Sequence, residues 1–511
     1  MQTKRDQVQA HMFVMGRLTS SMLRSDPDAP ESPQGRTNRG TAIGVVIGVI
    51  VCAGAFVFGL IKPGTKDSWQ TSGNLIVNRD TGSRYLYLDG RLRPVRNYAS
   101  ARLLAGADLK SSTVGGKSLR GTPTGSPVGI PGAPDTLPGA GDLVSGPWQV
   151  CSRPVADTGG AADGGGTDAG PDAGPGGRKR PATVTTLAVG SDAADVPLGR
   201  DRGLLVTGPD GTAYLVWQGS RLRLDRAARA ADALGYGSTA PLPVSAAFLT
   251  ALPAGPDLTP PPVPGRGKPG PVLGGQATTV GQVFRVTVPG SVPRLHLLRQ
   301  DGLVPLTDTA AALLLGDPAT RQQAYGGGAA LVRQLGADAL TGNLAPGTAK
   351  AVLGAGLPAS PPRAAEVTGD LAPCVRIQPD GDGPRVGVAL VADSALGPAA
   401  QPPAEGMVPA CLPVDRITVP AGSGALVHVL GGGGTEVGNT AYLVTDTGMK
   451  YRVPDAAAMK ALGYAGATPR ALPSLLLSMV PTGPDLTTEA AADGKAVPTA
   501  PRCAENGARR R

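Results

Sequence analysis

Two stretches of this sequence are copies of each other, and this restricts the fold more than any other feature of the chain. Residues 213–259 and 441–487 align without a gap at a constant offset of 228 positions, with 18 identities in 47. The strings AYLV, ALGY and GPDLT recur intact. Self-similarity of this kind indicates one supersecondary unit used more than once, whose copies pack on each other or on a shared core.

Two shorter copies cover residues 84–106 and 294–317. In chain order we call the four copies repeats 1 to 4. Each has a strand-like run, a tight turn and a second short strand. The turns contain a glycine, which supplies the positive φ that tight hairpins need: Asp89-Gly90, Gln218-Gly219, Asp301-Gly302 and Thr447-Gly448.

A helix is expected after each hairpin, because a residue that can cap a helix precedes an Ala/Leu-rich run in every copy. The predicted caps are Asn97, Asp225, Asp308 and Asp455. The two long copies add a second helix bounded by prolines, within 244–253 and 473–481. A hairpin with one or two short helices buries too little surface to fold alone.

These patterns predict an α+β fold: one transmembrane helix, then an elongated extracytoplasmic region of four hairpin-plus-helix repeats around a β-rich core. With 75 Gly and 51 Pro in 511 residues, the composition excludes a coiled coil and fits a loop-rich chain. Residues 128–138 and 283–290 are expected to be strand and turn material. The predicted segments are 1–40 (cytosolic, with a short amphipathic helix), 41–61 (transmembrane), 62–110 (linker and repeat 1), 111–202 (core, with a flexible Gly/Asp-rich loop at 156–180), 203–260 (repeat 2), 261–282 (Pro/Gly-rich connector), 283–320 (repeat 3), 321–430 (core), 431–490 (repeat 4) and 491–511 (mobile tail).

Residues 41–61 form a run of 21 residues without a charge. An α-helix needs about this length to cross a bilayer. Forty residues precede this run, so we interpret it as an uncleaved anchor and not as a signal peptide. The basic residues Lys4, Arg5, Arg17, Arg24, Arg36 and Arg39 lie before it, whereas Lys62 and Lys66 follow. The positive-inside rule then predicts a cytoplasmic N-terminus and an extracytoplasmic C-terminal region.

The net charge of +9 does not indicate a nucleic-acid-binding protein, because basic residues are scattered and aromatic residues are rare. Four cysteines, Cys151, Cys374, Cys411 and Cys503, fall in the exported region, where an oxidising environment favours disulfides. Four thiols allow three pairings. None lies in a CxxC motif or near a histidine, so no metal site is expected.

One fragment resembles a phosphate-binding loop. Gly116, Lys117 and Ser118 match the end of the G-x-x-x-x-G-K-[ST] pattern, but Ser111 stands where the first glycine belongs. Glycines and a proline follow at once and oppose the helix that such a loop requires. The sequence therefore predicts an ordinary loop here, with ATP binding as the alternative, and it offers no catalytic set.

Val8, Met12, Met15 and Met22 recur at helical spacing in the cytosolic segment. Such a helix either docks on a partner or the membrane surface, or simply precedes the anchor.

The sequence resembles the EccB membrane subunit of type VII (ESX) secretion systems. The resemblance rests on RDQVQAHMFVMGRL at the N-terminus, the single span, LIVNRDTGSRYLYLDGRLRPVRNYASARLL at 75–104, VGIPGAP at 128–134, GPDGTAYLVWQGSRLRL at 208–224 and the later GPDL. It implies four repeats flanking a β-rich core, and a disulfide between Cys151 and Cys374, which leaves Cys411 and Cys503 as a second pair.

The resemblance also implies a cell-membrane complex with the FtsK-like motor EccC, EccD and EccE, which exports WXG100-type proteins, with this chain as a homo-oligomer. The family carries an ATPase attribution, so ATP is the one implied cofactor and enzymatic activity stays open, although the sequence has no complete nucleotide motif. Three hypotheses follow: a structural channel subunit, an extracytoplasmic ATPase using Lys117, and a cell-wall-binding anchor.

Overall fold

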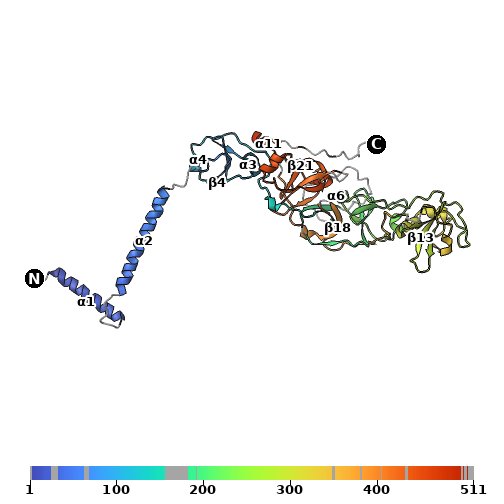
Figure 1. Ribbon diagram of the computed structural model, residues 1–511, viewed down its shortest axis with the longest axis horizontal. Coiled ribbons are helices and arrows are strands. Elements are labelled where there is room, and N and C mark those ends of the chain that lie inside the picture. Colours follow the sequence, from blue (N-terminus) through green and yellow to red (C-terminus); the bar gives the residue numbers. More distant parts are fainter. Residues whose placement is uncertain are drawn as a thin grey trace, which may run out of the picture.

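The computed structural model describes residues 3–24, 33–61, 68–155, 182–191, 193–347, 352–379, 383–403, 405–431, 436–496, 499 and 503. Two long helices stand apart from a row of small β-sheets, which gives the chain an elongated shape (Figure 1). The predicted flexible loop at 156–180, and most of the predicted mobile tail, lie outside the described residues.

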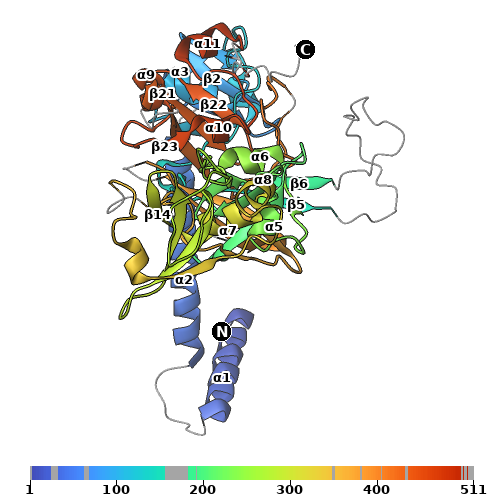
Figure 2. The same ribbon diagram turned by 90° about the vertical axis from the view of Figure 1, so that its right-hand side faces the viewer.

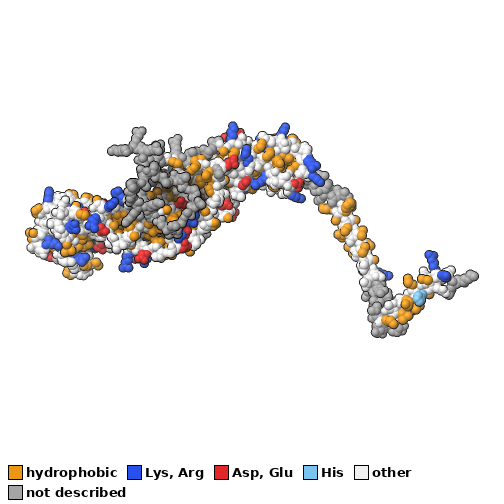
Figure 3. Space-filling model, turned by 180° about the vertical axis from the view of Figure 1, so that it is seen from behind, with side chains coloured by type: hydrophobic (Ala, Val, Ile, Leu, Met, Phe, Trp, Pro, Cys, Tyr) orange, Lys and Arg blue, Asp and Glu red, His pale blue; other side chains and the backbone are white. Residues whose placement is uncertain are grey.

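The two N-terminal helices are α1 (Lys4–Arg24) and α2 (Pro33–Ile61). Within α2, Thr37–Phe58 has a mean hydropathy of 2.6 and no buried residue; among the described residues it is the one helix long and apolar enough to cross a membrane. Its apolar side chains are exposed along its length (Figure 3). The helix begins at Pro33, before the predicted span of 41–61; proline is favoured in the first turn of a helix.

All four repeats share one sheet topology. A three-stranded antiparallel meander is followed by a fourth strand that pairs parallel with the first. The strands are β1 (Leu75–Asn78), β2 (Arg84–Leu88), β3 (Arg91–Pro94) and β4 (Ser111–Val114) in repeat 1; β8 (Arg202–Thr207), β9 (Ala213–Trp217), β10 (Ser220–Arg223) and β11 (Leu242–Pro243) in repeat 2; β12 (Val283–Thr287), β13 (Arg294–Arg299), β14 (Gly302–Leu306) and β15 (Arg333–Gly336) in repeat 3; and β20 (Gly424–Leu430), β21 (Glu436–Thr445), β22 (Lys450–Val453) and β23 (Arg470–Pro473) in repeat 4.

The second and third strands of each sheet form the hairpin that the sequence predicts. In repeat 3 the turn lies one residue earlier than predicted, because Gly302 already pairs with Arg299, whereas in repeats 1 and 2 the expected turn residues adopt the required geometry. In repeat 2, Gln218 and Gly219 have φ of 46° and 75°. Both values are positive, as in a type I′ turn, and repeat 1 has the same turn at Asp89 and Gly90.

The first and fourth strands extend the repeats beyond the predicted boundaries. Strands β4, β15 and β20 lie in segments expected to be core, and β16 (Arg363–Ala364) also joins the repeat 2 sheet through β8. These strands are two to seven residues long. Their pairing is decided by contacts with distant segments, so local patterns did not identify them.

The helices are α3 (Tyr98–Ala105) and α4 (Gly116–Leu119) in repeat 1, α5 (Ala230–Ala233) and α6 (Ala246–Ala251) in repeat 2, α7 (Asp308–Gly316) and α8 (Pro318–Ala324) in repeat 3, and α9 (Ala456–Ala461), α10 (Ser474–Leu477) and α11 (Thr488–Asp493) in repeat 4. Short 3-10 helices are η1 (Ala140–Asp142), η2 (Ala337–Leu340) and η3 (Asp393–Leu396). Helix α11 continues past residue 491, where the tail was expected to begin, because buried Ala491 packs in the repeat 4 core.

Two of the four predicted helix caps are correct. The side chains of Asn97 and Asp455 accept from the backbone N–H groups of Ser100 and Ala458. In repeat 3 the cap is Thr307, one residue earlier than predicted, because its hydroxyl already accepts from the Ala310 N–H.

In repeat 2 the predicted cap, Asp225, instead closes a turn before α5. Its carboxylate accepts from the backbone N–H groups of Ala227 and Ala228 at 2.9 and 3.1 Å. The N-cap position is Arg229, with φ 53° and no side-chain bond to the helix. The four residues of α5 start after this turn.

A fifth sheet forms the centre of the molecule, with strand order β19-β6-β5-β17-β18-β7. Its strands are β5 (Trp148–Pro154), β6 (Thr183–Val189), β7 (Asp195–Pro197), β17 (Leu371–Gln378), β18 (Arg385–Ala392) and β19 (Arg416–Thr418). The largest hydrophobic cluster joins this sheet to repeats 2 and 4; it includes Trp148, Phe248 and Leu476. The two long repeats therefore share one core with the central sheet.

The repeats do not follow sequence order in space. Helix α3 of repeat 1 packs on α9 and α11 of repeat 4, α10 of repeat 4 packs on α6 of repeat 2, and α5 of repeat 2 packs on α7 of repeat 3. The order along the molecule is therefore repeat 1, repeat 4, repeat 2 and repeat 3, which Figure 1 shows from blue through red and green to yellow. Figure 2 views the molecule from the repeat 3 end.

Residues 128–138 form no strand beyond one isolated bridge between Val95 and Val128. The segment is a buried loop fastened to the start of α3. The Asn97 amide donates to the Ile130 carbonyl at 2.7 Å, and the Ile130 N–H donates to the Ser100 hydroxyl at 2.9 Å. The expected strand does not form because this backbone bonds to several separate segments, through the Asn97 and Ser100 side chains and through backbone groups such as the Ala491 carbonyl, and not to one neighbouring strand.

Candidate functional site

The phosphate-loop fragment lies at the start of α4, a helix of only four residues. Lys117 is exposed and Ser118 is half-buried. A phosphate-binding loop presents several free N–H groups at the start of a longer helix. The three matching residues are adjacent in sequence: Gly116, Lys117 and Ser118. The longer helix that a phosphate-binding loop requires does not follow them, because α4 ends at Leu119.

A carboxylate already occupies the anion-binding position of this turn. The Gly116 N–H donates to the Asp80 carboxylate at 2.8 Å. A phosphate would have to displace this negatively charged group, which opposes its approach. The geometry around residues 116–118 therefore favours a closed structural turn.

Two disulfides lie in the structure. Cys151 on β5 and Cys374 on β17 are directly opposite each other in register, and their sulfurs are bonded. Cys411 is bonded to Cys503, which fastens Cys503 to the loop that precedes β19. These are the pairs that the family resemblance implied. Cys52 is a free cysteine exposed on α2.

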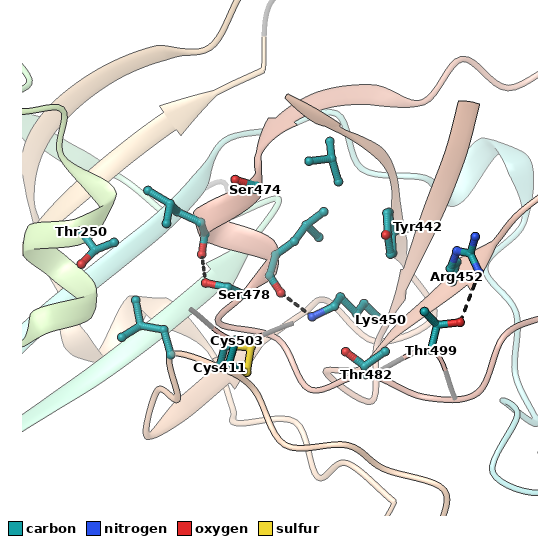
Figure 4. A pocket seen from close by; sticks show the side chains of 14 residues that line it. Thr250, Cys411, Tyr442, Lys450, Arg452, Ser474, Ser478, Thr482, Thr499 and Cys503 are labelled. Atoms are coloured by element: carbon teal, nitrogen blue, oxygen red, sulfur yellow. Dashed lines mark hydrogen bonds between the residues drawn. A yellow bond between two sulfur atoms is a disulfide. The ribbon is translucent and has the colours of Figure 1, made fainter. Parts of the chain in front are cut away.

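A cavity of about 600 Å³ lies where repeat 4 meets repeat 2 and the Cys411–Cys503 disulfide (Figure 4). We call it the repeat 4 cavity. Its apolar wall includes Leu412, Val429, Leu475 and Leu477, and its polar lining is Thr250, Cys411, Tyr442, Lys450, Arg452, Ser474, Ser478, Thr482, Thr499 and Cys503. Its size and mixed lining are typical of small-molecule sites.

Lys450 is the most unusual group in this lining, because it is a lysine with only 4% of its surface exposed. Its ammonium donates to the carbonyls of Leu477 and Val480, each at 2.5 Å. The Leu477 carbonyl is the last of α10 and the Val480 carbonyl lies three residues further on, so the lysine bonds both the end of that helix and the loop after it. Burial lowers the pKa of Lys450 to about 8 from its ordinary value of 10.5.

Two further polar groups distinguish the cavity wall. Arg452 donates to the Asp485 carboxylate at 2.8 Å, and the Thr499 hydroxyl donates to the same carboxylate at 2.7 Å. The Thr482 hydroxyl has no hydrogen-bond partner among the described residues, although only 2% of this residue is exposed. Most buried hydroxyls have partners, so this one requires an explanation.

Sequence reasoning did not single out Lys450, Arg452, Thr482 or Asp485. The available signal was the recurrence of GPDLT, which contains Asp257 in repeat 2 and Asp485 in repeat 4. The string recurs because it forms a loop that pairs with the second hairpin strand. Only the structure shows which side chains this loop brings to the cavity.

The fold defines a class of protein: a chain with one membrane-type helix near its N-terminus, followed by four sheets of common topology around a central sheet. The sequence profile of a family described as "Type VII secretion system ESX-1, transport TM domain B" matches residues 1–499. The match covers nearly the whole chain, and the chain belongs to this EccB family.

Similar proteins come from mycobacteria. The chain is 28% identical over 507 residues to the ESX-3 secretion system ATPase EccB3 of Mycolicibacterium smegmatis, covering 94% of this chain and 89% of that protein. It is 31% identical over 316 residues to the ESX-1 secretion system ATPase EccB1 of the same species, covering 61% of each.

Two solved structures have the same fold. A chain of an intact ESX-5 inner membrane complex has a TM-score of 0.61 at 23% identity, covering 96% of this chain and 95% of that one. A chain of an EccB3 dimer from the ESX-3 core complex has a TM-score of 0.60 at 24% identity, covering 82% and 99%.

Proposed function

We propose that this chain is a structural, membrane-anchored subunit of a type VII secretion channel that exports WXG100-type proteins. The observation that carries the proposal is the family match over residues 1–499, which includes the apolar helix and all four repeats. The fold shared with a chain of an ESX-5 inner membrane complex supports the same role. Anchoring and assembling such a complex needs no catalytic centre in this chain.

In this proposal, α2 spans the cell membrane, α1 is cytoplasmic and the sheets are extracytoplasmic. The basic residues before the span support this orientation. Both disulfides lie in the segment that it exports to an oxidising compartment. A cysteine-reactive, membrane-impermeant reagent should label Ser191→Cys in intact cells and should not label Thr3→Cys; the opposite pattern would reverse the orientation.

The proposed partners are the FtsK-like motor EccC, EccD, EccE and further copies of this chain. Helix α1 is the proposed docking element, because Val8, Met12 and Met15 are more than half exposed on one face. The family resemblance suggests the motor complex as the partner, and the dimer of a similar chain supports self-association.

The test is extraction of the tagged full chain from native membranes in mild detergent, followed by native sizing and mass spectrometry. We expect a large complex containing an FtsK-like ATPase and a multispanning subunit. Met12→Gln with Met15→Gln should disrupt it, whereas Ala10→Gln with Ser21→Gln, on the other face of α1, should not. Recovery of the wild-type chain alone, or with wall enzymes, would overturn the proposal in favour of a wall-binding anchor.

ATP hydrolysis is the second candidate, because the similar mycobacterial proteins are named ATPases. The contact between Gly116 and Asp80 argues against residues 116–118 as its site. We therefore expect Lys117→Ala to leave any ATP turnover of the purified full chain unchanged. A loss of turnover in a folded Lys117→Ala variant would instead locate the site at this turn.

A further inference from the structure

The segment after the fourth strand of a repeat crosses the sheet, and in repeats 2 and 4 this crossing is buried. Helix α6 follows β11, and helix α10 follows β23. Their side chains Phe248 and Leu476 lie in the core shared with the central sheet, and the two helices pack on each other. Neither helix contains a charged residue. In these two repeats the face of the crossing is therefore an apolar interface inside the molecule.

Helix α4 is the corresponding element of repeat 1. It follows β4 at one edge of the sheet, and the chain then reaches β3 at the other edge, where the Leu92 N–H donates to the Pro123 carbonyl at 2.9 Å. Between the two edges, Leu119 packs in a cluster with Trp69 on the sheet. Helix α3 lies on the opposite face and packs on repeat 4. The α4 face is therefore at the end of the row of sheets, on the side of α2 (Figure 1).

This face of repeat 1 is basic where those of repeats 2 and 4 are apolar. Lys117 on α4 and Arg120 at its end are exposed, and neither forms an ion pair with a described residue. The Asp80 carboxylate is already bonded to the Gly116 N–H at the start of the helix. Two exposed cations in place of buried apolar side chains indicate a negatively charged partner.

The position of the membrane-type helix indicates which negatively charged surface is within reach. Helix α2 ends at Ile61, and Trp69, eight residues later, already packs in the same cluster as Leu119. Eight residues span at most about 29 Å. With α2 in a bilayer, the α4 face can therefore reach the membrane surface, where anionic lipids attract basic side chains.

We propose that the α4 face docks on the headgroups of anionic phospholipids in the membrane that α2 spans. Lys117 and Arg120 donate to the lipid phosphates, while Leu119 holds the helix on the sheet. The inference rests on the proposed anchoring by α2 and adds a second membrane contact, which fixes how the row of sheets stands on the bilayer. Lys117 then serves a lipid phosphate and not a nucleotide.

The experiment uses the full chain in nanodiscs of phosphatidylcholine alone, or of equal parts phosphatidylcholine and phosphatidylglycerol. In a Cys52→Ala background, a fluorophore is attached at Thr81→Cys, in the exposed loop that contains Asp80, and lipids with nitroxide headgroups quench it. We expect two fluorescence lifetimes, from docked and undocked chains, and more docked chain in the discs with phosphatidylglycerol. A fluorophore at Val292→Cys, exposed in the distant repeat 3, should not be quenched.

Matched variants test the two cations. Lys117→Gln with Arg120→Gln should lower the ratio of docked to undocked chain about 25-fold, because each basic residue near an anionic surface contributes about fivefold. Arg91→Gln with Arg96→Gln removes the same charge from β3 and from the segment before α3, and should leave the ratio almost unchanged. High salt should lower the ratio for the wild-type face.

The inference is wrong if quenching at Thr81→Cys is equal in both kinds of disc or absent from both, or if the folded Lys117→Gln/Arg120→Gln variant docks like wild type. The lipid comparison leaves the basic residues intact, so it decides the matter even if this variant does not fold. Crosslinking from a photoreactive residue at position 117 to a protein in native membranes, and not to lipid, would also overturn it. A chain that does not enter nanodiscs contradicts the anchor itself, whereas insertion without lipid dependence contradicts only this inference.

Discussion

Repeats 2 and 4 are built on the same hydrogen-bond frame, and they use it in different surroundings. The GPDL loop pairs with the second hairpin strand in both. Gly255 donates to the Arg221 carbonyl and Gly483 to the Lys450 carbonyl, each at 2.9 Å. The comparison shows that the recurring string is kept for backbone pairing, while the side chains around it are free to diverge.

The structure corrects the gap-free alignment of the two repeats. Arg221 and Lys450 occupy the same frame position but differ by 229 in number, whereas Tyr236 and Tyr464 keep the offset of 228. The repeat 2 hairpin has a two-residue turn; in repeat 4, Gly448, with φ 72°, lies in a turn one residue longer. Repeat 2 regains this residue before α5. Two compensating shifts of one residue leave identity counts almost unchanged, so the alignment conceals them.

Burial separates the two copies. The ion pair of Arg223 with Asp257 is exposed, at 58% and 43% of the side chains, whereas the equivalent pair of Arg452 with Asp485 is at 31% and 9%. The Thr499 side chain bonds to both Arg452 and Asp485, so the C-terminal segment covers the repeat 4 pair. The same motif therefore contributes differently to stability at its two positions.

The largest expected effect tests whether the two repeats share one core. Phe248 on α6 and Leu476 on α10 are equivalent, and both are buried in the cluster that contains the central sheet. Phe248→Ala should lower the free energy of unfolding by about 3–5 kcal/mol, and Leu476→Ala should lower it by about 2–5 kcal/mol. Hydrogen exchange should show both repeats opening in either variant. Opening confined to the mutated repeat would break the shared-core view.

The buried cation should make repeat 4 respond to pH. Below pH 8, folded and unfolded chains both carry the Lys450 proton, and its burial cost is fully present. Because the folded pKa is about 8 and the ordinary value is 10.5, the unfolded chain binds more protons between these values, so stability rises with pH. The gain is about 1–3 kcal/mol.

Melting temperatures at pH 7 and pH 9.5 provide the measurement. Lys450→Arg introduces the residue type that repeat 2 has at this position. Because arginine stays charged in this pH range, this variant should not show the rise in melting temperature. An equal rise in wild type and variant would show that another group is responsible.

The two ion pairs should differ in strength. Asp485→Asn leaves Arg452 partly buried without its countercharge and should cost about 2 kcal/mol. Asp257→Asn affects an exposed pair and should cost less than about 1 kcal/mol, with the difference from wild type disappearing in high salt. If hydrogen exchange near the two sites shows equal losses of stability, burial does not make the two ion pairs differ in strength.

The smallest effect concerns a matched pair of tyrosines. The Tyr236 hydroxyl donates to the Pro362 carbonyl at 2.6 Å, and the Tyr464 hydroxyl donates to the Pro138 carbonyl at 2.8 Å. Each phenylalanine variant should cost about 1 kcal/mol, because a buried carbonyl loses its donor. Hydrogen exchange near residues 362 and 138 should rise only in the matching variant. If both variants affect the same segment, the anchors are not independent.

Local patterns were enough to predict the membrane-type helix, the four hairpins and the two second helices. An uncharged run of 21 residues, glycines at tight turns and prolines at helix ends act through the backbone of their own segment. The family resemblance was also available from the sequence. The helix caps at Asn97 and Asp455 were predictable for the same local reason.

The sequence by itself thus determined the repeating unit and the anchor. Only the tertiary structure decided which strands complete each sheet, the spatial order of the repeats and the burial of Lys450 beside Thr482. The physical reason is distance along the chain. The Tyr464 hydroxyl donates to the Pro138 carbonyl, 326 residues away in sequence. The Asp80 carboxylate, from the loop after β1, accepts from the Gly116 N–H. Such contacts depend on how whole units pack, and no local pattern of residues encodes them.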